Sequence, residues 1–69
     1  MSNPTYKKIE LTGTSKESIE DAVNNAISKA GESMRKLRWF EVDEIRGSIA
    51  ENKAHQWQVT IKVGFRLED

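Results

Sequence analysis

The feature that most constrains the fold is a stretch of strict alternation near the end of the chain. From position 55 to position 67 every second side chain belongs to a mainly apolar set: His55, Trp57, Val59, Ile61, Val63, Phe65 and Leu67. The residues between them are polar or small: Gln56, Gln58, Thr60, Lys62, Gly64 and Arg66, with Glu68 following. Successive side chains of a β-strand point to opposite faces of its sheet. The pattern therefore predicts a long strand with one buried face and one polar face.

A helical pattern lies earlier in the chain. Thr14 and Glu17 have the spacing of a capping box, with Ser15 and Ser18 as a weaker alternative. Apolar residues then recur every three or four positions: Ile19, Ala22, Val23, Ala26, Ile27, Ala30, Met34 and Leu37. This spacing predicts one helix that ends at about Leu37 and carries an apolar stripe for the buried face of the sheet.

Two further segments complete the expected sheet. Tyr6–Leu11 alternates like a short strand, and the cluster Thr12–Ser15 after it predicts a turn. From Trp39 the chain alternates again, but its phase slips, which indicates a bulge or strong bend between Glu44 and Gly47. Ala50–Lys53 has the length of a hairpin connection. We therefore expect an α+β fold in the order strand, helix, strand, strand.

Length and charge narrow the class of protein. The chain has 69 residues with 11 basic and 11 acidic side chains, so we expect a single domain over residues 1–69. The formal charge of zero argues against a dedicated duplex-binding protein, which usually carries a basic excess. No apolar run is long enough to span a bilayer, and the N-terminal residues do not resemble a signal peptide. We expect a cytoplasmic protein without nucleic-acid or membrane partners.

Cysteine is absent and His55 is the single histidine. Disulfides, thiol nucleophiles and cysteine-based zinc sites are thereby excluded. No motif for phosphate, dinucleotide or metalloprotease chemistry is present, and we expect His55 to lie on the surface or at an interface. Because a domain this small rarely stabilises itself on one core alone, self-association is a first hypothesis.

Trp39 does not fit the burial pattern. By parity it falls with Glu41 and Asp43 on the polar face of the sheet. One interpretation is that it fills a helix–sheet corner or a subunit interface. The other is that it offers a flat stacking platform to a planar ligand, with Gln58 as the nearby side chain suited to pair with the edge of a heterocycle.

Three parts of the chain together resemble the dodecins, small flavin-binding proteins that assemble from twelve copies. The matching segments are Leu11–Ser15, Trp39–Val42 with Ile45–Gly47, and Trp57–Thr60 continuing through Val63–Leu67. The resemblance covers nearly the whole chain. It implies a β-α-β-β subunit whose three-stranded antiparallel sheet curls around one long helix, and a hollow homododecamer built from such subunits.

The resemblance also implies a ligand and the residues that hold it. A flavin (FMN, riboflavin or FAD) would lie between subunits, with its ring stacked on Trp39 and its polar edge against Gln58. Arg46 matches an arginine close to the ligand, and Glu44 matches an acidic position that reaches the ribityl chain in some members. Trp57 stands where Tyr or Phe is usual, and its parity predicts altered packing on the helix side more than altered ligand contact.

The function expected is therefore storage of a flavin and quenching of its excited state, without catalysis and without a metal. One alternative is a structural or nucleotide-binding shell that takes a ligand such as coenzyme A. A second is a small enzyme that uses the bound flavin. A third is a module for single-stranded nucleic acid, which the neutral charge and the single aromatic residue on the polar face disfavour.

Overall fold

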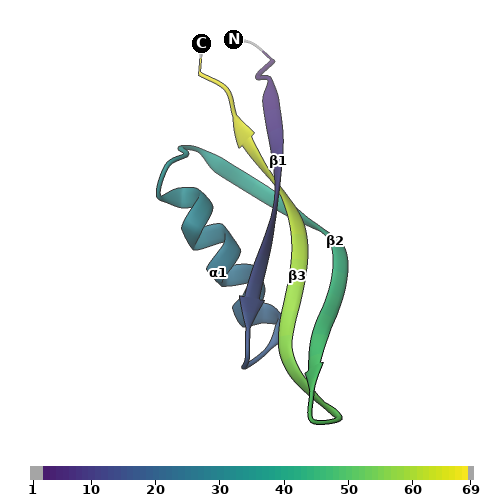
Figure 1. The fold of residues 1–69 in the computed structure, drawn as a ribbon. Coiled ribbons are helices and arrows are strands. Elements are labelled where there is room, and N and C mark those ends of the chain that lie inside the picture. The colour runs from purple at the N-terminus through teal and green to yellow at the C-terminus, as the bar shows by residue number, and fades with distance from the viewer. Residues whose placement is uncertain (1–2, 69) are drawn as a thin grey trace.

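The structure is a computed structural model and describes residues 3–68. Its elements follow in the order β1 (Tyr6–Ser15), α1 (Ile19–Gly31), β2 (Leu37–Ala50) and β3 (Lys53–Arg66). The strands form one antiparallel sheet in the order β1-β3-β2. Figure 1 shows α1 against one face of this sheet and the β2–β3 hairpin extending beyond the helix. The predicted element order and the three-stranded antiparallel sheet are confirmed.

The helix begins at a different cap from the one predicted. Ser18 is the N-cap, and its Oγ accepts a hydrogen bond from the backbone N–H of Asp21 at 3.0 Å. Thr14 and Glu17 do not form the predicted capping box. Thr14 belongs to β1, and the backbone N–H of Glu17 donates to Oγ of Ser15 at 2.8 Å. Because β1 continues through position 15, the helix can start only after the chain has left the sheet.

The helix also ends earlier than predicted, at Gly31 and not near Leu37. Lys36 has a φ of 62°, a left-handed conformation that an α-helix of L-residues does not contain. Leu37 begins β2 and packs against the core from there. The apolar spacing that continues to Leu37 therefore serves two elements, because the core receives side chains from the helix and from the strand that follows it.

The turn predicted at Thr12–Ser15 is wrong, because β1 runs straight through these residues. Gly13 pairs with Val59 of β3 and lies directly beneath α1. A Cβ atom at position 13 would overlap the carbonyl oxygen of Ala22 and lie 2.8 Å from Cβ of Ala26. The glycine is there because the helix approaches the strand closely, and not because the chain reverses.

The phase slip predicted in the second strand is present, but it is centred on Asp43, just before the predicted interval. β2 has three register shifts, located between Leu37 and Trp39, between Val42 and Glu44, and between Ser48 and Ile49. The hairpin turn consists of Glu51 and Asn52, whose φ angles are 53° and 63°. Two consecutive left-handed residues are typical of the type I′ turn, whose twist suits a two-residue hairpin.

The core lies between α1 and the middle of the sheet. Val59, Ile61 and Val63 of β3 are fully buried, and they pack with the helix residues Ala22, Val23 and Ala26. The face of β3 predicted to be buried is therefore confirmed. Trp57 is half-buried and packs at the edge of this core, on the helix side as predicted. Among the described residues no helix has both the length and the apolar character needed to cross a membrane.

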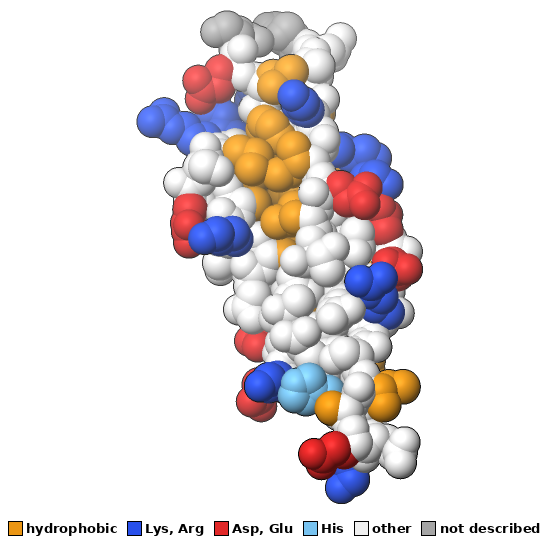
Figure 2. All heavy atoms as spheres, in the orientation of Figure 1, with side chains coloured by type: hydrophobic (Ala, Val, Ile, Leu, Met, Phe, Trp, Pro, Cys, Tyr) orange, Lys and Arg blue, Asp and Glu red, His pale blue; other side chains and the backbone are white. Residues whose placement is uncertain are grey.

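α1 packs on β1 and β3, so the helix-facing side chains of β2 remain uncovered. Phe40, Val42 and Ile45 pair in register with the three core residues of β3, yet they are 48%, 44% and 52% exposed. We call these three residues the β2 apolar row. Figure 2 shows one face of the molecule, where apolar side chains gather in the upper half between acidic and basic ones. A contiguous exposed apolar row is typical of a surface that another chain covers.

Candidate functional site

The side chains predicted for the site all lie on the sheet face that points away from α1, which we call the open face. Trp39, Glu44 and Arg46 of β2 pair with residues of β3 that alternate with its core residues, and Gln58 is one of these. Directly opposed residues of paired strands share a face. The sheet therefore brings the four predicted residues to one surface.

Trp39 stands at one end of the open face with its ring fixed in place. A Cβ atom added to Gly64 would overlap three neighbouring atoms of the benzene ring of Trp39, so the ring covers that glycine with its face. The indole N–H donates to Oε2 of Glu41 at 2.8 Å. Tyr6 meets the indole in an edge-to-face arrangement, with centroids 5.2 Å apart and planes at 68°. Trp39 is 38% exposed, although Gly64 backs one side of its ring.

Glu41 connects Trp39 to the first strand. Its carboxylate accepts from the indole N–H and also from Nζ of Lys8, which lies 3.1 Å from Oε2. The hydrogen bond from Trp39, followed by that from Lys8, lowers the pKa of Glu41 below its ordinary value of 4.5. The carboxylate is therefore ionised at neutral pH and holds the indole N–H in one direction.

The other end of the open face carries a chain of hydrogen bonds between side chains. Nε of Arg46 donates to Oε1 of Gln58 at 2.8 Å, and Nε2 of Gln58 donates to Oε1 of Gln56 at 3.3 Å. Ser48 is paired with Gln56 across the hairpin, and its buried Oγ has no hydrogen-bond partner among residues 3–68. We call these four residues the polar ladder.

The two ends of the open face are well separated within one chain. Trp39 pairs with Gly64, which lies six residues beyond Gln58 along β3, and at about 3.3 Å per residue this separation is about 20 Å. The expectation that Gln58 lies near Trp39 is therefore wrong for a single chain, although both residues share a face. This backbone separation is longer than a fused three-ring heterocycle.

Charged side chains occupy the middle of the open face. Nζ of Lys62 and Oδ2 of Asp43 form an ion pair at 2.7 Å, and this contact raises the pKa of Lys62 above its ordinary value of 10.5. Glu44 pairs in register with Thr60 and is exposed. No group of three or more His, Cys, Asp or Glu side chains is arranged to hold a metal ion in the part of the chain that the structure describes.

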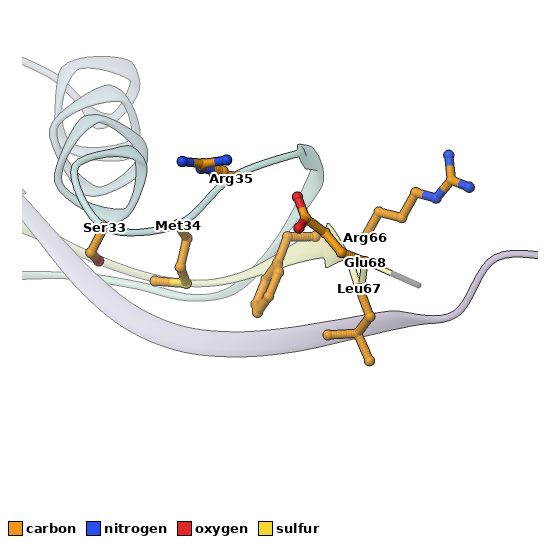
Figure 3. Close-up of a pocket in the computed structure, with 7 residues that line it drawn as sticks. Ser33, Met34, Arg35, Arg66, Leu67 and Glu68 are labelled. Carbon is orange, nitrogen blue, oxygen red and sulfur yellow. The ribbon is translucent and has the colours of Figure 1, made fainter.

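A separate recess of about 360 Å³ lies beside the last residues of β3. Its lining consists of Ser33, Met34, Arg35, Phe65, Arg66, Leu67 and Glu68. In Figure 3 the guanidinium groups of Arg35 and Arg66 point away from one another. The two cations therefore do not converge on one position, as they would around a bound phosphate.

Sequence reasoning missed the residues that hold Trp39. Gly64 carried a usable signal, because a glycine inside a strand often marks a close approach by another group. Glu41 carried a weaker one, since residues two apart on a strand share a face. Tyr6 carried none, because its contact with Trp39 depends on how the first and second strands flank β3.

Known proteins are similar to this chain in both fold and sequence. A model of the Dodecin family matches residues 5–68. Dodecin from Thermus thermophilus is 52% identical over 64 residues, which cover 93% of this chain and 93% of that protein. The structure of dodecin from Streptomyces coelicolor has a TM-score of 0.94 at 48% identity, covering 100% of this chain and 99% of that chain.

A more distant relative has the same fold and a described calcium-binding site. It is the calcium dodecin from Mycobacterium tuberculosis, whose structure is described as having a calcium-binding site. Its TM-score is 0.81 at 26% identity, and the match covers 93% of this chain and 91% of that chain. Together the family match, the sequence identity and the shared fold confirm the resemblance seen in the sequence: this chain belongs to the dodecin family.

Proposed function

We propose that this protein binds and stores a flavin on Trp39 and does not turn over a substrate. The observation that carries the proposal is an indole that Gly64 and Glu41 hold in place while the residue remains 38% exposed. Aromatic stacking contributes about 0.5–1.5 kcal/mol beyond the burial of area. A ring held in place before binding also loses less conformational freedom when the ligand arrives.

The proposed pocket is shared between copies of the chain. Since Trp39 and Gln58 of one copy are about 20 Å apart along the strand, a ring stacked on Trp39 of one copy meets Gln58 and Arg46 of another. Association of the copies would bury the exposed β2 apolar row. The twelve-subunit shell expected from the resemblance is the assembly that we propose.

The side chains on the open face suit the parts of a flavin. Gln58 offers a donor and an acceptor to the pyrimidine edge of the ring. The guanidinium of Arg46 suits either the ring face or the phosphate of FMN, and Glu44 can accept from the ribityl hydroxyls. A bound flavin supplies a light-absorbing, electron-accepting ring, and a tryptophan in contact with it quenches its excited state by electron transfer.

The test is a fluorescence titration of riboflavin and FMN, with the particle size measured by light scattering. Wild-type protein should quench each flavin saturably. Trp39→Ala should abolish that quenching while the assembly persists. Trp57→Phe is the matched control, because this second tryptophan packs on the helix side, and it should bind like wild type. Unchanged affinity in Trp39→Ala would overturn the proposal.

A mixing experiment tests whether the pocket is shared. Trp39→Ala and Gln58→Ala copies are unfolded together and reassembled in equal amounts. If each site takes its tryptophan and its glutamine from different copies, about a quarter of the sites recover both residues, because the two copies are drawn independently in a symmetric assembly. If both residues came from one copy, no site would recover. Titration of the mixed particles decides between the two arrangements.

The alternative ligands have less support from the described residues. The two guanidinium groups of the Figure 3 recess do not converge, which weakens the case for a phosphate-rich ligand such as coenzyme A at that place. On the open face both lysines are paired with acids, Lys8 with Glu41 and Lys62 with Asp43, while Arg46 donates to the neutral Gln58. Such paired charges do not form the basic groove that nucleic acid requires.

A further inference from the structure

We infer that Gln56 is a positioning residue that, together with Arg46, fixes the direction in which Gln58 presents its amide to the ligand. This inference rests on the proposed function, because it names what selects the ring edge at the same site. The amide oxygen of Gln58 faces Nε of Arg46 at 2.8 Å, and its nitrogen faces the oxygen of Gln56 at 3.3 Å. The two hydrogen bonds thus run in the same direction, because Arg46 donates to Gln58 and Gln58 donates to Gln56.

The direction of the ladder is set at the Arg46 end. A guanidinium has only donors, so the group of Gln58 that faces it is the amide oxygen. If the amide turned over, its NH₂ would face Nε of Arg46, and two donors would oppose each other without an acceptor. With the oxygen held by Arg46, Nε2 points toward Gln56, which has to offer an acceptor.

The far end of the ladder is not satisfied within one chain. Gln56 uses Oε1 to accept from Gln58, which leaves its NH₂ group free of this bond. Ser48 stands opposite Gln56, and its buried Oγ has no partner among the described residues. A buried hydroxyl without a partner is uncommon in folded proteins. This end of the ladder therefore has hydrogen-bonding capacity that the described residues do not use.

A fixed amide selects one kind of ring edge. After its bonds to Arg46 and Gln56, the Gln58 side chain keeps one acceptor position on Oε1 and one N–H on Nε2. The complementary edge carries an N–H next to a carbonyl, as in a cyclic imide or lactam. The pyrimidine ring of a flavin has such an edge at N3, and methylation of that nitrogen removes its donor. The ladder should therefore favour riboflavin over N3-methylriboflavin.

The test compares an acceptor with a donor at position 56. Gln56→Glu keeps an oxygen that accepts from Gln58, whereas Gln56→Lys offers only donors. Both ligands are uncharged, so the added charge has little direct effect on them. We expect Gln56→Glu to keep the wild-type preference for riboflavin over N3-methylriboflavin. We expect Gln56→Lys to lose about tenfold in riboflavin affinity, the usual cost of a hydrogen bond replaced by an unmatched donor, while its affinity for the methylated ring stays the same.

Two controls separate the possible failures. His55→Lys adds the same charge at the neighbouring residue, which lies on the opposite face of β3, and should leave both affinities unchanged. Ligand-free crystals of Gln56→Lys should show the Gln58 amide moved from its wild-type position, whereas those of Gln56→Glu should keep the contact with Gln58. Equal riboflavin affinities in the Lys and Glu variants, with normal wild-type binding, would overturn this inference alone. A wild-type particle that binds neither ring would overturn the proposed function and this inference with it.

Discussion

The indole of Trp39 lies face-on against the backbone of Gly64, its partner across β2 and β3. In this contact the protein itself covers one surface of the ring. It depends on the absence of a side chain at position 64, because any Cβ would overlap the ring. The stacking surface that we propose thus depends on a glycine on one strand and a tryptophan on the next.

Substitution of that glycine should weaken both binding and folding. In Gly64→Ala the methyl group displaces the Trp39 ring, and we expect a loss of about 1–3 kcal/mol in stability, typical of overpacking, together with at least about a tenfold loss of riboflavin affinity from the missing stacked surface. Fluorescence titration and thermal unfolding measure the two effects. Gly31→Ala is the matched control, because its Cβ would meet only Cδ1 of Leu37, at 3.8 Å. Wild-type affinity in Gly64→Ala would show that the position of the indole is unimportant.

The bond between Glu41 and Trp39 should make the indole environment sensitive to acid. The pKa of Glu41 is lowered in the folded protein from its ordinary value of 4.5. Its contribution to stability is therefore present above the unfolded pKa and is lost as the pH falls through the folded one. Tryptophan fluorescence of Trp57→Phe, followed from neutral pH downward, should show a transition below pH 4.5.

Adding Glu41→Gln to this variant should remove the transition, because the amide does not titrate. The same acid transition with and without Glu41 would assign it to another group.

The β2 apolar row should be required for assembly. Ile45 is 52% exposed within one chain, and Ile45→Asp would place a charge in any interface that covers it, at a cost of several kcal/mol when the charge is unpaired. Light scattering should show smaller particles. Lys16→Asp, a change at an exposed residue between β1 and α1, should leave the particle size unchanged. Full-size particles of Ile45→Asp would place the interface elsewhere.

The two candidate helix caps can be separated by paired substitutions. Ser18→Ala removes the acceptor of the Asp21 N–H, and we expect a loss of about 1 kcal/mol. Thr14→Ala should change the free energy of unfolding little, since Thr14 contributes its carbonyl to the helix, as the acceptor for Nδ2 of Asn25. Urea unfolding at a fixed protein concentration compares them. A larger loss for Thr14→Ala would support the capping box that the spacing alone predicted.

The amino-acid pattern alone was enough to predict the two-faced last strand, the order of the elements and the face on which Trp39 lies. These features depend on the alternation of side chains along one strand, which is a local property of the backbone. The same local pattern also placed Gln58 on the open face, together with Arg46 and Glu44. That is why the side of the sheet occupied by the candidate site could be predicted.

Three features could be seen only in the folded chain: where the helix ends, how far β1 runs and how far Trp39 lies from Gln58. Apolar spacing continues past Gly31 because Leu37 serves the same core from a strand, so periodicity alone cannot locate the end of the helix. The separation along the open face depends on strand register, which the bulges of β2 shift by whole residues. Register is set by long-range pairing and core packing, and the residues of one segment do not encode it alone.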